Sequence, residues 1–241
     1  MNIKNNLDYV NQRIAVALLR RREFFMGRGE ADFNIDGKIT IAAASKYIGA
    51  DSIVEAYHAG LCVFGENKIQ DLKSKYSEIK DSHPEIFSKL KFHAIGHLQT
   101  NKVRDAVSCS EMIQSVDSIK LARVINEQCV KLDKNIGVLI EVKTSGDDLK
   151  SGIAPDEAIS LAGEIMKLER LELCGVMTMA SLTGDEKIVK GCFTRAYEVF
   201  IELRKRYDQR CRFLSMGMTD DFELAVECGA NIIRLGRILF K

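Results

Sequence analysis

The sequence predicts an α/β protein, a single (β/α)8 barrel of the TIM type with an extra helix before it. Short apolar or β-branched runs alternate with segments of helical spacing, a pattern typical of a parallel sheet. The runs number eight, which matches the strand count of a closed barrel. They lie near residues 39–45, 61–64, 91–96, 112–116, 136–142, 172–177, 212–216 and 231–235.

One alternative architecture, an open doubly wound sheet, shows the same alternation. No G-x-G-x-x-G fingerprint follows the first run, so the closed barrel is favoured. A helical pattern at about 6–26 precedes the first run, and the stretch 27–37 separates the two. We therefore expect residues 1–241 to form one domain, in which a helix within residues 1–30 packs on the barrel. Each run except the last is expected to be followed by a helix.

Composition and charge narrow the functional class. Hydrophobic residues make up 46% of the chain and charged residues 29%, as in soluble globular proteins. A net charge of +1 gives no reason to expect a nucleic-acid or membrane partner, and Arg20, Arg21 and Arg22 are interpreted as a solvated helix face. No apolar stretch approaches the roughly 20 residues that span a bilayer, and the N-terminus lacks an apolar signal core. We expect a cytoplasmic protein.

The residues that could bind a metal do not form a metal-site pattern. Seven scattered cysteines without a C-x-x-C pair indicate reduced thiols rather than disulfides or a zinc site. In an extended strand, His93 and His97 lie about 13 Å apart, too far to share one ion. No metal site is expected. His97 is a candidate for the polar wall of a pocket, and the alternative is a hydrogen-bonded structural histidine.

Lys46 is the first candidate for chemistry, because the carboxyl ends of barrel strands build the active face. It follows the run I-T-I-A-A-A-S, and burial among such small apolar neighbours favours a neutral amine by disfavouring the charged form. A neutral lysine is a nucleophile that forms a Schiff base with a carbonyl. In the alternative interpretation, Lys46 reaches solvent or pairs with Glu66.

The segment S-M-G-M-T-D-D-F-E (215–223) carries the first signal for binding phosphate. Its glycine turn runs into an expected helix with Thr219 as the cap, and free N–H groups at a helix start attract anions. The alternative is an ordinary capped helix start.

The segment R-L-G-R (234–237) carries the second such signal. Gly236 permits close approach of a backbone, and Arg234 and Arg237 are expected on one side of the last strand. The alternative is a surface ion pair. A lysine able to form an imine and two neighbouring phosphate signals together suggest pyridoxal 5′-phosphate (PLP) as the cofactor.

Short motifs along residues 39–240 resemble, in order and spacing, the YggS/PROSC pyridoxal-phosphate homeostasis protein family. They are A-A-A-S-K (42–46), F-G-E-N (64–67), H-A-I-G-H-L-Q-T-N-K (93–102), Q-S-V-D-S (114–118), T-S-G-D-D-L-K-S-G (144–152), G-V-M-T-M (175–179), S-M-G-M-T-D-D-F-E-L-A (215–225) and R-L-G-R (234–237). The resemblance implies a barrel like the N-terminal domain of alanine racemase, which is a type III PLP fold.

The resemblance also implies a set of cofactor-binding residues. Lys46 would hold PLP as a covalent aldimine, Arg234 would face the pyridine nitrogen, and Asn67 would line the pocket. Family members often have threonine where this chain has Arg237, so a guanidinium is expected in place of one phosphate-binding hydroxyl. The implied phosphate cup consists of Ser215, Met218, Thr219, Gly236 and Arg237.

Two functions that use PLP compete for this site, and a third option, a cofactor-free scaffold that binds a partner protein, requires Lys46 to be merely structural. The resemblance implies an intracellular PLP carrier or regulator for vitamin B6 homeostasis, with no catalytic residues expected and PLP-requiring apo-enzymes as transient partners. Nothing in the sequence requires a dimer, so we expect a monomer. The alternative is a racemase-like PLP enzyme. Racemisation needs a proton-transfer group on each face of the substrate carbon, and the chain ends at Lys241 without the further domain that supplies the second group in alanine racemases. Arg234 does not readily give a proton to the pyridine nitrogen, which weakens the ring as an electron sink. The carrier is therefore favoured.

Overall fold

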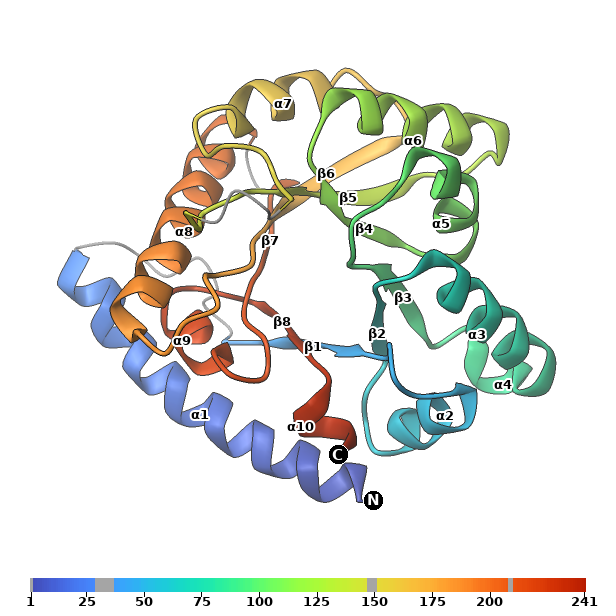
Figure 1. The fold of residues 1–241 in the computed structure, drawn as a ribbon, viewed down its shortest axis with the longest axis horizontal. Coiled ribbons are helices and arrows are strands. Elements are labelled where there is room, and N and C mark those ends of the chain that lie inside the picture. Colours follow the sequence, from blue (N-terminus) through green and yellow to red (C-terminus); the bar gives the residue numbers. More distant parts are fainter. Residues whose placement is uncertain (1, 29–36, 147–150, 208–209) are drawn as a thin grey trace.

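The computed structural model describes residues 2–28, 37–146, 151–207 and 210–241. Within these ranges, parallel strands close into an eight-stranded barrel whose spatial order follows the sequence (Figure 1). The predicted barrel and its extra N-terminal helix are confirmed. The strands are β1 (Thr40–Ala44), β2 (Val63–Glu66), β3 (Lys91–Ala94), β4 (Met112–Val116), β5 (Ile136–Glu141), β6 (Leu171–Met177), β7 (Phe213–Ser215) and β8 (Ile232–Leu235).

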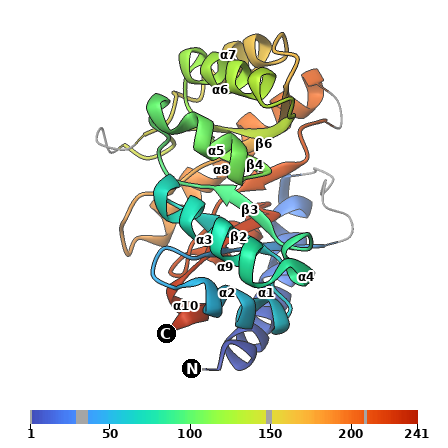
Figure 2. The same ribbon diagram turned by 90° about the vertical axis from the view of Figure 1, so that its right-hand side faces the viewer.

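Helices surround the barrel and join its strands, as the turned view shows (Figure 2). The helices are α1 (Ile3–Arg28), α2 (Ala50–His58), α3 (Ile69–Ser82), α4 (Pro84–Phe87), the 3-10 helix η1 (Thr100–Lys102), α5 (Val103–Cys109), α6 (Ile119–Lys131), α7 (Ala158–Ile165), α8 (Glu186–Tyr207), α9 (Phe222–Glu227) and α10 (Arg237–Phe240). None of the helices in the described ranges combines the length and apolar character needed to cross a membrane.

The two faces of each strand bury different sets of side chains. On β5, Val138 and Ile140 belong to the large core under the helices, whereas Leu139 packs in a small cluster with Met112 and Cys174. Because side chains alternate across a strand, that small cluster fills the inside of the barrel. Glu141 follows Leu139 by two residues, so its side chain also points inward.

The second strand differs from its prediction. It extends to Glu66, because Gly65 and Glu66 pair with His93 and Ala94 of β3. A side chain at Gly65 would lie 2.7 Å from the side chain of Ile95, so glycine is needed for this close packing. Gly65 and Glu66 are therefore strand residues rather than the loop predicted after residue 64.

Helix α1 lies along α9 and α10 (Figure 1). Its Arg21 is 1% exposed and donates a 2.8 Å hydrogen bond to the carbonyl of Ala230, with its guanidinium over the ring of Phe25. The interpretation of Arg21 as part of a solvated face is therefore wrong, since it satisfies a carbonyl just after α9. The expectation of no helix after the last strand is also wrong, because α10 follows β8. The side-chain amide of Asn6, on α1, donates a 3.0 Å hydrogen bond to the carbonyl of Leu239 in α10.

Candidate functional site

The carboxyl ends of β1, β2 and β8 meet at one mouth of the barrel. Ala44 pairs with Gly65 of β2, and Ala43 pairs with Leu235 of β8. A Cβ atom at Gly236 would lie 3.3 Å from the carbonyl oxygen of Ala44, so glycine lets the β8 end approach the β1 end closely. This register brings Gly236 beside the segment that carries Lys46.

Lys46 lies in the turn just after β1. The N–H of Ile48 donates to the carbonyl of Ser45 at 3.0 Å, which closes this turn. Lys46 is exposed, and its ammonium lies 4.9 Å from the centroid of the Tyr47 ring. The expected burial of Lys46 is therefore wrong, because β1 ends two residues earlier and the side chain leaves the packed interior. An exposed amine at the mouth can be reached by a ligand.

Glu66 is not the partner of Lys46. Its Oε2 atom accepts hydrogen bonds from Lys75 Nζ at 2.6 Å and from the hydroxyl of Ser45 at 2.9 Å. Its Oε1 atom accepts from the N–H of Asn67 at 2.9 Å. Of the alternative interpretation of Lys46, the part in which its side chain reaches solvent is therefore confirmed, and the part in which it pairs with Glu66 is wrong, because Lys75 of α3 forms that ion pair.

Asn67 and His97 lie on the neighbouring strand ends. A Cβ atom at Gly96 would lie 2.4 Å from the carbonyl oxygen of Asn67, so the two backbones touch at this glycine. Asn67 is exposed. The His97 side chain is 58% exposed, with Nδ1 3.9 Å from a carboxylate oxygen of Asp117 and 3.5 Å from the hydroxyl of Ser151. Both predicted residues therefore stand at the mouth.

Arg234 points from β8 into the barrel and is 5% exposed. It donates 2.8 Å hydrogen bonds to the Ser215 hydroxyl and to the Thr178 carbonyl. Burial lowers the pKa of its guanidinium to about 10, against the attraction of Glu141 and Asp221. Among the described residues, no carboxylate forms an ion pair with Arg234, so a buried cation faces the mouth with donors to spare.

A chain of hydrogen bonds orients this arginine across the barrel. Ser215 accepts from Arg234 and donates to Gln114 Oε1 at 2.7 Å, and Gln114 Nε2 lies 2.9 Å from His93 Nδ1. Burial, and then the positive charge of Lys91, lower the pKa of His93 to about 4. A neutral His93 accepts the Gln114 amide hydrogen at Nδ1, which gives every link a donor and an acceptor.

Glu141 adds a buried carboxylate to the same interior. It is 2% exposed, and its Oε2 atom has no hydrogen-bond partner. Burial, and then the negative charge of Asp117, raise its pKa to about 7, against the opposing effect of Arg234. The interior therefore holds a charged arginine and a carboxyl group that titrates near neutral pH.

The phosphate-cup segment differs from its prediction in two respects. Helix α9 begins at Phe222 with Asp221 in the cap position, so Thr219 lies in the preceding turn and is not the cap. The reason is Gly217, whose φ of +93° reverses the chain before the helix can start. Ser215 is fully buried, and its hydroxyl bonds Arg234 and Gln114 rather than facing the mouth.

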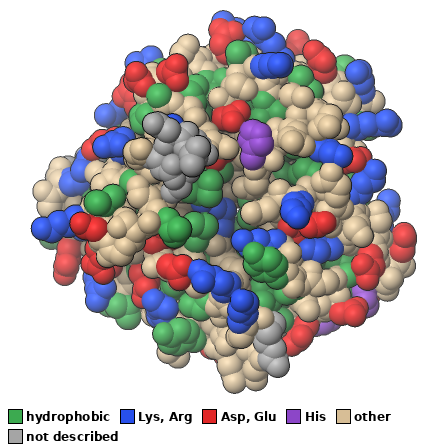
Figure 3. Space-filling model, in the orientation of Figure 1, with side chains coloured by type: hydrophobic (Ala, Val, Ile, Leu, Met, Phe, Trp, Pro, Cys, Tyr) green, Lys and Arg blue, Asp and Glu red, His purple; other side chains and the backbone are tan. Residues whose placement is uncertain are grey.

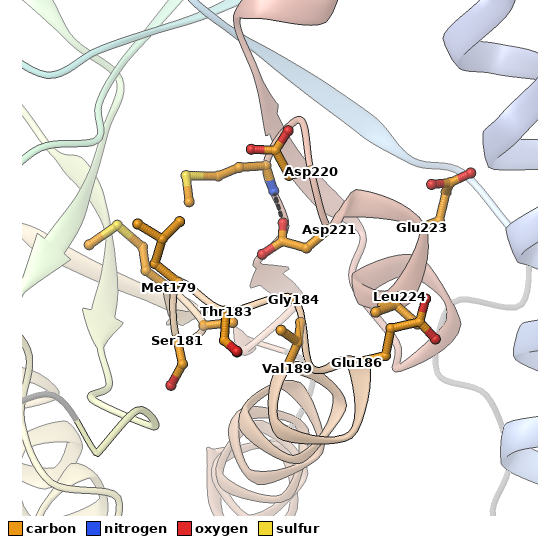
Figure 4. Close-up of a pocket in the computed structure, with 13 residues that line it drawn as sticks. Met179, Ser181, Thr183, Gly184, Glu186, Val189, Asp220, Asp221, Glu223 and Leu224 are labelled. Carbon is orange, nitrogen blue, oxygen red and sulfur yellow. Dashed lines mark hydrogen bonds between the residues drawn. The ribbon is translucent and has the colours of Figure 1, made fainter.

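Met218 and Asp221 close the turn between β7 and α9. The N–H of Met218 donates to Asp221 Oδ1 at 2.6 Å, the dashed contact in Figure 4. This turn forms one wall of a cavity of about 420 Å³, whose other walls come from the β6–α8 loop and the start of α8 (Figure 4). Met218 is 38% exposed. The cavity lies beside the turn and does not include Lys46 or Arg234 among its lining residues.

Arg237 does not share a side with Arg234. The strand ends at Leu235, Gly236 turns the chain, and Arg237 begins α10. Its side chain is 56% exposed, and its guanidinium pairs with Asp220. The expected alignment of the two arginines is wrong, because residues three apart in an extended strand point to opposite faces and because the strand ends at Leu235, before Arg237.

Several residues of this site carry no local sequence signal of their role. Lys75, Gln114 and Glu141 were not predicted, although Gln114 lies inside a quoted motif. An inward-pointing polar residue at every second position of an apolar run is the signal that could have identified Gln114 and Glu141. Residues 147–150 of the T-S-G-D-D-L-K-S-G motif lie outside the described residues.

The face that looks toward the reader in Figure 1 carries interspersed basic and acidic side chains (Figure 3).

Comparisons with known proteins agree with the barrel fold. A family model described as "Alanine racemase, N-terminal domain" matches residues 39–241. The pyridoxal phosphate homeostasis protein of Helicobacter pylori is 37% identical over 84% of this chain and 87% of its own length. That of Aquifex aeolicus is 35% identical over 100% of this chain and 98% of its own. The structure of PipY from Synechococcus elongatus with PLP bound has a TM-score of 0.77 and 33% identity, covering 84% of this chain and 92% of that one.

Proposed function

This chain belongs to the pyridoxal phosphate homeostasis protein family, and we propose that it binds PLP at the barrel mouth and serves PLP homeostasis as a carrier or regulator. The observation that carries the proposal is that Lys46 follows β1 and Arg234 lies on β8, which is the neighbouring strand. Lys46 offers an exposed amine just after β1, and Arg234 offers a buried cation on β8, next to β1 in the barrel. An aldehyde cofactor with an anionic group and an aromatic nitrogen needs both features.

The residues present fit this cofactor. Arg234 is a buried cation with unused donors, and it suits an electron-rich acceptor such as a pyridine nitrogen. Gly236 leaves a space that a side chain would fill against Ala44. We assign the phosphate to Met218, Thr219, Gly236 and Arg237.

Other residues complete the proposed pocket. Asn67 and His97 stand exposed at its rim. Ser215 acts from behind, since its hydroxyl holds Arg234 in place. Arg237 gives up its ion pair with Asp220 when its guanidinium binds the phosphate. That ion pair is weak because both side chains are exposed.

Bound PLP supplies an aldehyde that forms a Schiff base with an amine, and we propose Nζ of Lys46 as that amine. The surrounding groups determine how far further chemistry can go. Arg234 is held by Ser215 and Thr178 and keeps its protons, so it donates to the ring nitrogen without protonating it. A ring nitrogen without a proton withdraws electrons weakly, which disfavours carbanion chemistry while leaving exchange between amines open.

This argument favours a carrier over a racemase-like enzyme. The relatives are named homeostasis proteins, which supports the same choice. We propose that the protein acts as a monomer in the cytoplasm and passes PLP to apo-enzymes during brief encounters. Exposure of Lys46 at the mouth suits such transfer, because an incoming amine can reach it.

A titration with PLP tests the proposal. Wild type is expected to gain a visible absorbance band on adding PLP, and Lys46→Ala is expected to lack the band while keeping its fold. Lys68→Ala removes another exposed lysine after β2 and should retain the band. A wild-type protein that binds no PLP, or a Lys46→Ala variant that keeps the band, would contradict the proposal. Sustained turnover of an amino acid by the pure protein would favour the racemase-like alternative.

A further inference from the structure

We propose that Lys75, on α3, is a positioning residue that holds the two strand ends carrying Lys46 and Asn67 where the cofactor needs them. This inference rests on the proposed function. Lys75 lies outside the predicted site, and we do not expect it to contact PLP. It acts through the backbone of the residues that are proposed to bind PLP.

The ammonium of Lys75 reaches the peptide next to Lys46. Its Nζ atom donates to the carbonyl of Ser45 at 2.7 Å, and that carbonyl also accepts the N–H of Ile48 at 3.0 Å. The same carbonyl oxygen therefore closes the turn that bears Lys46 and anchors it to α3. Without the lysine, the Ser45 carbonyl keeps only the local hydrogen bond from Ile48 and loses its connection to α3.

The same ammonium controls the β2 end through Glu66. Nζ of Lys75 lies 2.6 Å from Oε2 of Glu66, whose Oε1 accepts the N–H of Asn67 at 2.9 Å. The Ser45 hydroxyl donates to Oε2 at 2.9 Å and to the Gly65 carbonyl at 3.2 Å. One ion pair thus connects the peptide before Lys46 with the peptide of Asn67.

Burial makes the Glu66 carboxylate depend on the ammonium of Lys75. The side chain of Glu66 is 1% exposed and that of Lys75 is 13% exposed, so the carboxylate of Glu66 cannot exchange this cation for water. A buried carboxylate that loses its cation reorganises or takes up a proton, and either change shifts or weakens the hydrogen bond that it accepts from the N–H of Asn67. The cost of removing Lys75 therefore appears in the geometry of the mouth as well as in stability.

Lys134 provides a matched control at the other end of the strands. Its Nζ atom donates to the carbonyls of Val107 and Ser110, both at 2.7 Å, and it is also part-buried. Those carbonyls lie before the start of β4, at the opposite end of that strand from the barrel mouth. Lys134→Met removes an ammonium clamp of the same kind without touching the mouth.

The test compares wild type, Lys75→Met, Lys75→Arg and Lys134→Met by PLP titration and by urea unfolding without ligand. Lys75→Met is expected to weaken PLP binding at least about tenfold, an effect of about 1.4 kcal/mol. It should also lower the fraction of bound PLP that borohydride fixes on Lys46. Lys75→Arg should recover much of both, because its guanidinium can reach the same two acceptors. Lys134→Met should lose stability and keep its PLP affinity within about twofold.

The outcomes separate the two proposals. A wild type that binds no PLP refutes the proposed function and this inference with it. A wild type that binds PLP, with Lys75→Met matching Lys134→Met in affinity and fixed fraction, overturns the inference alone. If Lys75→Met fails to fold, the double variant E66Q/K75M removes the stranded charge. The double variant keeps an acceptor for the N–H of Asn67 but lacks the hydrogen bond from Lys75 to the Ser45 carbonyl. Weaker PLP binding by this variant supports the inference, and unchanged binding overturns it.

Discussion

Glu141 gives the most quantitative prediction, because a buried carboxyl group links stability to pH. Its pKa is raised to about 7 from an ordinary 4.5, by burial first and by Asp117 second. The folded protein therefore prefers the protonated form. The favourable contribution is fully present below pH 4.5 and is lost as pH rises through about 7.

The size of the effect follows from the two pKa values. Their difference, about 2.5 pH units, corresponds to roughly 3 kcal/mol at about 1.4 kcal/mol for each pH unit. Glu141→Gln replaces the titrating group with a neutral isostere. The free energy of unfolding of the variant should exceed that of wild type by up to about 3 kcal/mol at pH 8, and the two should agree within about 1 kcal/mol at pH 4.5.

Urea unfolding at several pH values between 4.5 and 8 measures this difference. Glu127→Gln, at an exposed position of α6, is the control and should track wild type throughout. A Glu141→Gln variant no more stable than wild type at pH 8 would refute the reasoning. So would a stability gain that does not depend on pH.

Three further predictions test the interior network and the turn. Burial lowers the pKa of His93 to about 4, so the stability that its neutral form contributes is present above pH 6.5 and is lost as pH falls through 4. Urea unfolding should show that His93→Gln loses less stability in acid than wild type does. Gln114→Leu strands the Ser215 hydroxyl and His93, and should cost about 1–3 kcal/mol and weaken PLP binding; unchanged values would remove Gln114 from the account. Gly217→Ala should destabilise by about 1–3 kcal/mol, because its φ is +93° and a Cβ atom would lie 2.5 Å from the Ala225 Cβ; equal stability in urea would contradict this.

The barrel could be predicted from the sequence because its signal is local. Alternating apolar runs and helical segments report the strand order directly, and a closed eight-stranded sheet in sequence order needs no long-range information. The strand ends were less predictable. Gly65 and Glu66 resemble turn residues until Ile95 and the β3 partners are in place.

The positions of Lys46 and Gly236 at the strand ends of the barrel mouth were predictable, because each follows directly from a single apolar run. The hydrogen-bond network was not, because its members are brought together only by the closed barrel. Ser215 and Gln114 are 101 residues apart, and Arg234 and Thr178 are 56 apart. Lys75 shows the same difficulty, since a lysine on an amphipathic helix normally indicates a solvated face.

The claim that Lys46 holds the cofactor has one most direct measurement. PLP-loaded protein is reduced with borohydride and digested, and mass spectrometry locates the phosphopyridoxyl group. The account predicts a single major adduct on Lys46, absent from Lys46→Ala and retained in Lys68→Ala. An adduct on another lysine, or none in a protein that binds PLP, would contradict it.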